Sequence, residues 1–221
     1  MAKIRIYSRK VDKEMPDEDF SRLLDTLCCD RREKTSKLKN PSSARESLVA
    51  GLLFQEVVQK ELKLSAGDIR ILRNKNGKPS IEGYNDFFYN ISHSGDMVVM
   101  ATGDTELGID IEGLRQRAAD DKVAQRCFSE RELKYYYGAK DKTEAFFEIW
   151  TMKEAYLKFL GCGISVPLNE FGVDPIERKT EYSRIGVCDR VQFEVKKSDG
   201  YIMSLCYENQ LDKATTIMYN S

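Results

Sequence analysis

The sequence lacks the long apolar segment that a membrane protein needs. Its longest apolar runs are short, as at Met97–Thr102, whereas a spanning helix takes roughly 20 residues. The N-terminus is basic but has no continuous apolar core of the kind that marks a secretory signal. We therefore expect a cytoplasmic protein without a membrane partner.

An excess of one charge is also missing. The chain has 35 basic and 36 acidic residues and a net charge of −1, so it has no global basic field with which to bind nucleic acid. This balance does not exclude a local basic patch. We expect no nucleic-acid partner.

Histidine is nearly absent, because His93 is the single one. That leaves little from which to build a Cys/His zinc site. No secretion signal accompanies the six cysteines, and a chain of this size does not need disulfides, so we expect reduced thiols. The remaining composition is ordinary, with 41% hydrophobic and 32% charged residues, which is enough for a real core.

Hydrophobic spacing and turn residues divide the chain into two halves that each read strand, helices, strands. In the first half, a capping box at Ser43 and Glu46 precedes a long amphipathic helix. The other expected elements are a strand at Ile4 and Ile6, a helix opening at Pro16, strands at 69–72, 87–91, 97–102 and 107–112, helices at about 116–126, 129–137 and 143–160, and strands near 171–174, 191–196 and 201–207. The predicted fold is α+β, with two similar α/β subdomains, 1–105 and 106–221, in a pseudo-twofold arrangement around a cleft.

Two carboxylates share one face of the strand 107–112. Because side chains alternate along a strand, Asp110 and Glu112 point the same way, about 7 Å apart at Cβ. Both can bend toward one cation, and without a cation they would repel each other. Gly108 on the same face leaves room for something bulky. A solvated strand face with ordinary surface acids explains the same pattern equally well.

The helix at 143–160 carries a second group of charges. Glu154 and Lys158 lie one turn apart and can act together, or they can form an ordinary surface ion pair. Lys153 projects into the apolar stripe of this helix, where an unpaired ammonium would be costly. It either extends to the surface or faces a buried acid or a ligand.

Residues 90–96 form a polar turn between two apolar strands, with hydroxyls, Gly95 and His93 suited to an anion. A lone histidine is more often structural. The N-terminal half adds candidate phosphate contacts, although basic residues before a helix are commonly just solvated. These candidates are Arg31, Lys34, Arg45 and Lys78.

Together these segments resemble the 4′-phosphopantetheinyl transferase superfamily, in its longer, surfactin-synthetase-activator type. Four motifs carry the resemblance, in the order and with the spacing of that family: Gly77–Pro79, Asn90–Gly95, Gly108–Glu112 and Trp150–Lys158. The resemblance covers roughly residues 25–165 well. It implies a monomer of two similar α/β halves with the site between them.

The activity that the resemblance implies is Mg²⁺-dependent transfer of the phosphopantetheine arm of coenzyme A to a serine of an apo acyl or peptidyl carrier protein, with release of 3′,5′-ADP. Two alternatives remain from the residues alone. One is another Mg²⁺-dependent enzyme on phosphate esters, such as a nuclease, and the other is a non-catalytic module that binds coenzyme A or a carrier. The aromatic residues at Phe128 and Tyr135–Tyr137 have two alternative roles, contact with the carrier or ordinary packing.

The resemblance also implies roles for individual residues. Asp110, Glu112 and Glu154 would bind Mg²⁺, and Glu154 would take the proton from the carrier serine. Lys158 would stabilise the pyrophosphate or the leaving group, which makes Glu154, Lys158 and Asp110 the catalytic set. The expected coenzyme A contacts are Ser92 and His93 at the phosphates, Lys158 at the pyrophosphate, and Arg31, Lys34, Arg45, Lys78 and Pro79 at the nucleotide end.

Overall fold

Alternating apolar residues build two main β-sheets in the computed structural model, which describes residues 2–114, 119–163, 166–186, 190–208 and 215–220. The first sheet has the strand order β11-β1-β5-β4 and the second the order β6-β10-β9-β8-β7. The first contains β1 (Ala2–Lys10), β4 (Phe88–Ser94), β5 (Met97–Gly103) and β11 (Thr215–Asn220). The second contains β6 (Leu107–Gly113), β7 (Phe171–Asp174), β8 (Lys179–Ser183), β9 (Val191–Ser198) and β10 (Tyr201–Glu208).

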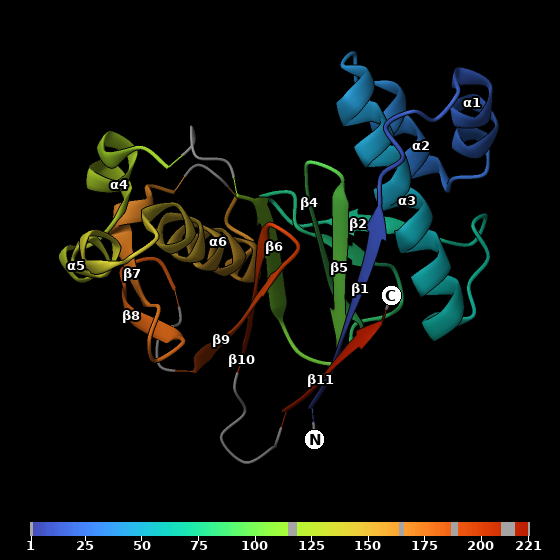
Figure 1. Cartoon of the computed structure of the whole chain (residues 1–221). Coiled ribbons are helices and arrows are strands. Elements are labelled where there is room, and N and C mark those ends of the chain that lie inside the picture. Colours follow the sequence, from blue (N-terminus) through green and yellow to red (C-terminus); the bar gives the residue numbers. More distant parts are fainter. Residues whose placement is uncertain (1, 115–118, 164–165, 187–189, 209–214, 221) are drawn as a thin grey trace.

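The long helix α3 (Pro41–Leu62) covers one face of the first sheet (Figure 1). Its buried side chains, among them Phe54 and Val58, pack with Val98 and Met100 of β5. The predicted capping box is wrong, because the side chain of Asn40 accepts a hydrogen bond from the backbone N–H of Ser43 and is the N-cap. Pro41 then occupies the first helical position, where its missing N–H costs nothing.

Two shorter helices precede α3, and a two-stranded sheet follows it. The helices are α1 (Asp17–Asp25) and α2 (Cys29–Ser36), and the strands are β2 (Ile71–Arg73) and β3 (Pro79–Ile81). The basic stretch after α1 is therefore helical, which its charged sequence does not indicate.

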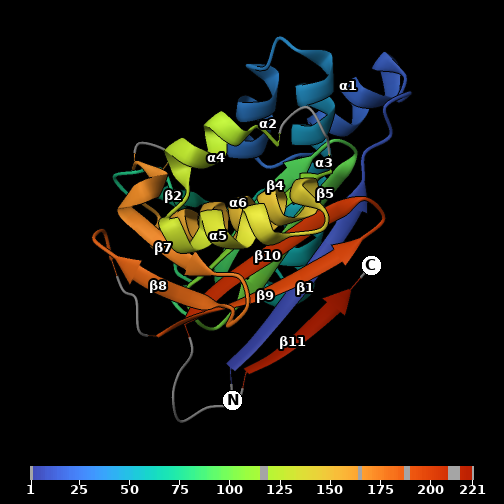
Figure 2. The ribbon, with the colours of Figure 1, turned by 60° about the vertical axis from the view of Figure 1, so that its left-hand side comes forward.

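In the C-terminal half, α6 (Lys142–Leu160) lies against the second sheet, with α5 (Glu130–Gly138) beside it (Figure 2). The short helix α4 (Asp121–Cys127) and a 3₁₀ turn, η2 (Leu168–Glu170), complete this half. The expected start of the first of these helices, at 116–118, lies outside the described residues. Phe128 and Tyr136 are buried in the core under α6, so packing accounts for both.

The sheet faces that point away from the helices pack on each other. Ile6 and Val99 from the first sheet meet Ile109 and Leu205 from the second in one apolar cluster. The α+β prediction is therefore confirmed. Strand β11 was not predicted, and it pairs in parallel with β1, from Ala2 opposite Thr215 to Tyr7 opposite Asn220 (Figures 1 and 2).

Neither α3 nor any other helix within the described residues has the length and apolar character that crossing a bilayer requires.

Candidate active site

Gly108 sets the distance between β6 and α6. A Cβ atom at this position would lie 2.2 Å from the carbonyl oxygen of Ala155 and 2.3 Å from the backbone nitrogen of Phe159. Only glycine therefore lets the helix backbone lie directly on the strand. The room that the sequence suggests for a bulky group is filled by α6 itself, which brings Glu154 and Lys158 to the face of β6 that carries Asp110.

Lys158, Asp110 and Ser92 form one hydrogen-bonded cluster. The Lys158 ammonium donates to Asp110 Oδ1 at 2.6 Å and to Ser92 Oγ at 2.8 Å. Ser92 Oγ donates to the same Oδ1 at 2.8 Å. The other carboxylate oxygen, Asp110 Oδ2, is buried and has no hydrogen-bond partner among the described residues. A buried carboxylate oxygen without a donor is costly unless something else binds it.

Glu154 shares the electrostatic surroundings of this cluster. Burial raises the pKa of its carboxyl group, and the negative charges of Asp110 and Glu112 raise the pKa further, while Lys158 acts in the opposite direction. The three acids therefore face one another closely enough to interact. The cluster has an excess of negative charge, since its three carboxylates are accompanied by the single positive charge of the Lys158 ammonium.

This donor set fits a divalent cation. Carboxylate oxygens are the ligands that Mg²⁺ prefers, and a cation would satisfy both Asp110 Oδ2 and the excess of negative charge. Within the described residues, no three His, Cys, Asp or Glu side chains stand in a geometry that already holds a metal. The side chains of the cluster would have to turn to bind one ion jointly.

The expected polar turn at 90–96 is wrong in part, because Asn90, Ser92, His93 and Ser94 belong to β4 and only Gly95 and Asp96 form the turn. Gly95 takes a positive φ of 64° there. His93 and its neighbours thus alternate between two faces, and the serines face β6 while His93 is exposed.

His93 pairs with Glu46 of α3, with 2.9 Å between Nδ1 and Oε2. Burial lowers the pKa of the imidazole, Glu46 opposes this, and the nearby charges of Lys158 and Lys34 lower the pKa further. The sequence analysis placed Glu46 in a capping box, so its contact with His93 was not predicted. His93 is therefore close enough to Lys158 and to Lys34 for their charges to act on its pKa.

Arg31 and Lys34 of α2 lie near Arg73 of β2, which the sequence did not single out. Burial lowers the pKa of Arg31, whose guanidinium donates to the Ser47 carbonyl oxygen at 3.4 Å. Lys34 is exposed overall, yet burial of its ammonium and the charges of Arg31 and Arg73 lower its pKa. Asp30 binds Arg73 at 2.7 Å. Three cations around one acid form a net positive site that suits a phosphate.

Arg45 and Lys78 bind groups of the protein. Arg45 donates to the Met15 carbonyl oxygen at 3.1 Å and thereby ties α3 to the start of α1. Lys78 pairs with Glu106 and donates to the Phe159 carbonyl oxygen at 2.7 Å. Pro79, the next residue, begins β3. Lys78 therefore joins the first half to the C-terminal end of α6.

Lys153 faces a buried acid, which decides between the alternatives that the sequence left open. Its side chain and that of Glu132 are both 0% exposed, and the two charged groups lie 2.9 Å apart. The ammonium also donates to the carbonyl oxygens of Leu168 and Phe171, at 2.9 and 2.7 Å. Lys153 thus points away from the carboxylate cluster and joins α5, α6 and β7.

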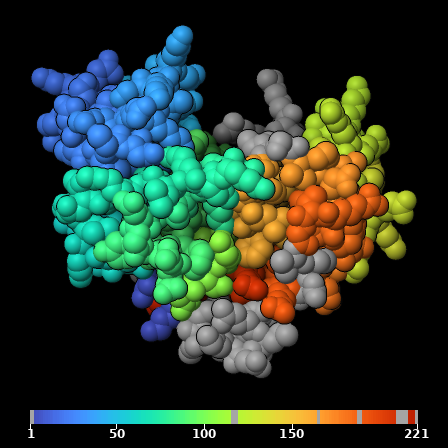
Figure 3. Space-filling model, turned by 180° about the vertical axis from the view of Figure 1, so that it is seen from behind, coloured from blue at the N-terminus to red at the C-terminus, as the bar shows by residue number. Residues whose placement is uncertain are grey.

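Residues of both halves line a hollow of about 520 Å³ beside Glu46 and Gly113. Its other lining residues are Lys13, Ser42, Gly95, Leu114, Gly200 and Tyr201. Seen from behind, the blue N-terminal helices and the orange C-terminal sheet stand on opposite sides of the molecule (Figure 3). The walls of this hollow therefore come from both halves of the chain.

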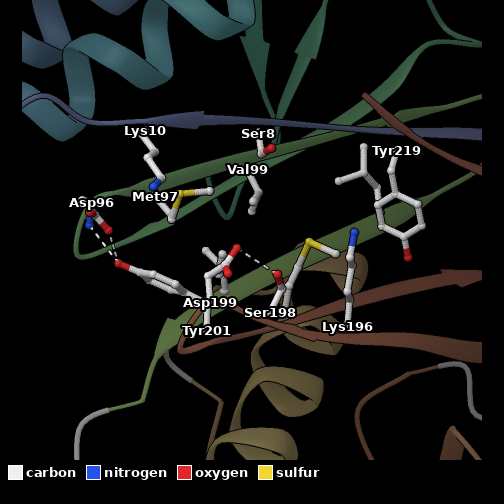
Figure 4. A pocket seen from close by; sticks show the side chains of 13 residues that line it. Ser8, Lys10, Asp96, Met97, Val99, Lys196, Ser198, Asp199, Tyr201 and Tyr219 are labelled. Atoms are coloured by element: carbon white, nitrogen blue, oxygen red, sulfur yellow. Dashed lines mark hydrogen bonds between the residues drawn. The ribbon is translucent and has the colours of Figure 1, made fainter. Parts of the chain in front are cut away.

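A second hollow, of about 490 Å³, has Ile111 of β6 in its lining. Figure 4 shows other side chains that line it, among them Met97 and Tyr201. The acids that line it are engaged, since Tyr201 donates to Asp96 and Ser198 donates to Asp199. None of Asp110, Glu112 and Glu154 lines it. The face of β6 that carries the carboxylates is therefore the candidate for chemistry.

Comparisons with known proteins agree on one family. The family model for the 4′-phosphopantetheinyl transferase superfamily matches residues 106–206, and that for the N-terminal part of 4′-phosphopantetheinyl transferase matches residues 14–105. The 4′-phosphopantetheinyl transferase Sfp of Bacillus subtilis (strain 168) is 33% identical over 173 residues, which cover 77% of this chain and 76% of that protein. The 4′-phosphopantetheinyl transferase gsp of Aneurinibacillus migulanus is 30% identical over 200 residues, or 89% of this chain and 83% of that protein.

A solved structure of a holo-(acyl-carrier-protein) synthase from Bacillus anthracis, in complex with CoA (3′,5′-ADP), is similar over a smaller part. It covers 45% of this chain and 92% of that chain, with 20% identity and a TM-score of 0.33.

Proposed function

The chain belongs to the 4′-phosphopantetheinyl transferase superfamily and is a transferase of the Sfp-like type, and we propose that it transfers the 4′-phosphopantetheine arm of coenzyme A to a serine of an apo carrier protein. The observation that supports this most strongly is the contact of Lys158 with Asp110 and Ser92, which joins three of the four family-like motifs at one point. Glu154 lies beside them in the same electrostatic cluster.

In the proposed reaction, the oxygen of the carrier serine forms a bond to the phosphorus that carries pantetheine. The bond from that phosphorus to the 3′,5′-ADP oxygen breaks, and the serine proton passes to Glu154. A carboxyl group whose pKa is raised by burial and neighbouring acids is a better base near neutral pH than an ordinary glutamate. Lys158 would offset negative charge on the pyrophosphate and on the leaving 3′,5′-ADP.

Asp110, Glu112 and Glu154 would hold Mg²⁺, a proposal supported by the unpartnered Asp110 Oδ2 and by the excess of carboxylates over ammonium. When bound, the ion supplies positive charge to the pyrophosphate oxygens as the phosphoryl bond changes.

The remaining contacts to coenzyme A would come from the first half. Ser92 and His93 would hold its phosphates, and Arg31 and Lys34 would take the nucleotide end with Arg73 beside them. Arg45, Lys78 and Pro79 would shape the wall of that end, since Arg45 and Lys78 already bind protein groups.

We also propose that residues 1–105 and 106–221 act as two subdomains of a cytoplasmic monomer. Support for a monomer comes from the hollow of about 520 Å³, whose walls are supplied by both halves of one chain.

One assay tests the proposed function. The protein is incubated with coenzyme A, Mg²⁺ and each of several apo acyl, peptidyl and aryl carriers, and the carriers are then weighed by mass spectrometry. We expect one carrier to gain one phosphopantetheine arm, and EDTA to prevent the gain. If no carrier gains mass, the transferase proposal fails, and retained binding of coenzyme A would then favour the non-catalytic alternative.

A further inference from the structure

Alternate side chains of β4 bind the neighbouring strand β6. Asn90 Oδ1 accepts a hydrogen bond from the backbone N–H of Ile109 at 3.0 Å. Ser92 and Ser94 follow on the same face and donate to Asp110 and Glu112, at 2.8 and 2.7 Å. Because β4 ends the first sheet and β6 ends the second, side chains connect the two sheets here. Each of the two strand carboxylates is thus held by a serine from the other half.

The Ser94 hydroxyl makes two hydrogen bonds, one as acceptor and one as donor. Its oxygen accepts a hydrogen bond from the backbone N–H of Gly113 at 3.2 Å. A hydroxyl has a single proton to donate, and that proton goes to Glu112 Oε2. Ser94 is buried at 7% exposure, so water does not offer an equivalent donor from the same position. The backbone of β6 therefore fixes the hydroxyl that orients the Glu112 carboxylate.

We propose that Ser94 is a positioning residue: it orients Glu112, which in turn would hold the divalent metal of the site. This proposal rests on the proposed function. Hydrogen bonds to a metal-ligating carboxylate hold its orientation before the ion arrives, and their loss weakens metal affinity. A substitution at Ser92 would not distinguish metal positioning from substrate binding, because Ser92 is itself an expected contact of coenzyme A. A substitution at Ser94 does distinguish them, since the Ser94 hydroxyl forms hydrogen bonds only with Glu112 and Gly113 among the described residues.

The test compares Ser94→Ala with Ser94→Thr and with a matched control. Alanine removes one oxygen atom and adds no bulk, whereas threonine keeps the hydroxyl and suits a strand. Ser183→Ala is the control, because Ser183 Oγ also accepts a backbone N–H, that of Ile185 at 3.3 Å, and binds Tyr156 rather than a carboxylate. Mn²⁺ binding is titrated by electron paramagnetic resonance, with and without coenzyme A.

We expect Ser94→Ala to weaken Mn²⁺ binding by about 10- to 100-fold, and Ser183→Ala to leave it unchanged. Ser94→Thr should bind Mn²⁺ within a few-fold of the native protein. Equal Mn²⁺ affinity of Ser94→Ala and the native protein would overturn the proposal, and so would an equal loss in Ser183→Ala. If threonine does not fit and the variant fails to fold, the smaller alanine variant decides alone.

A kinetic measurement separates positioning from general damage. For Ser94→Ala, half-saturation should move to higher Mg²⁺ while the kcat at saturating Mg²⁺ recovers most of the native value. A damaged fold would lower kcat at every Mg²⁺ concentration, which would count against positioning. If the native protein modifies no carrier, the proposed function fails, yet the Mn²⁺ titrations still decide the role of Ser94.

Discussion

At the scale of single residues, the site depends on where charges have partners and where they have none. Asp110 shows both conditions in one side chain, because Lys158 and Ser92 bind Oδ1 while Oδ2 is buried without a partner. Glu154 adds a third carboxylate beside Lys158. Because the carboxylates of this arrangement repel one another, replacing one of them should affect activity more than stability.

Glu154→Gln tests that expectation. The amide cannot accept the serine proton, so we expect kcat for carrier modification to fall by at least about 100-fold, within the usual range of a lost general base. The free energy of unfolding in urea should not fall, because one of three mutually repelling carboxylates is removed. A variant with near-native kcat would show that another group takes the proton.

Gly108→Ala should affect both fold and activity. The added Cβ would meet the backbone of Ala155 and Phe159 at 2.2 and 2.3 Å, and backbone atoms cannot turn aside as side chains do. We expect a loss of about 1–3 kcal/mol or more in the free energy of unfolding, together with reduced transfer as α6 moves. Gly138→Ala is the control, since nothing lies within 4 Å of a Cβ there, and it should unfold as the native protein does.

At the scale of elements, local sequence information predicted β6 and α6 well. Alternation defined β6, and the helix expected at 143–160 matches α6, which Asp141 caps by accepting the N–H of Glu144. The charged helix α2 was missed because it buries only Arg31 and Thr35 and so has no apolar stripe. Strand β11 was missed because its partner β1 lies at the other end of the chain. Strand β8 pairs with its neighbour β7 and was missed because its sequence, Lys179–Ser183, is largely polar and shows no apolar alternation. The motif residues were found because each motif is continuous in the sequence. Glu46 and Arg73 were not found, because they reach the site only through tertiary packing.

The buried pair of Lys153 and Glu132 joins α6 to α5. Glu132 also accepts the backbone N–H groups of Ser129 and Val173, at 2.6 and 2.7 Å. Lys153→Met would leave this carboxylate buried without its ion partner, and we expect a loss of about 3–5 kcal/mol in the free energy of unfolding. The double variant Lys153→Met with Glu132→Gln should recover part of that loss. Urea unfolding of the three proteins measures it, and equal stability of the single variant and the native protein would contradict this account.

At the scale of the whole molecule, polar contacts and a strand pairing add to the apolar packing between the sheets in joining the halves. Lys78 binds the carbonyl oxygen of Phe159 at the end of α6, β11 pairs with β1, and the side chains of β4 bind β6. The proposed coenzyme A contacts lie mainly in the first half and the proposed Mg²⁺ ligands in the second. A ligand that bridges the halves should therefore stabilise the molecule as one unit.

Thermal unfolding measures this coupling. Coenzyme A at 100 times its Kd should add about 2.7 kcal/mol to the free energy of unfolding, which corresponds to a rise in Tm of roughly 5–11 °C for a chain of this size. Because Asp110 would help to hold the Mg²⁺ whose positive charge favours the pyrophosphate of coenzyme A, EDTA should reduce the rise in the native protein. In Asp110→Asn the rise in Tm with coenzyme A should already be smaller without EDTA, and EDTA should not reduce it further. An EDTA-independent rise in the native protein would mean that coenzyme A binds without the carboxylate cluster, and the metal would then have to act at the chemical step alone.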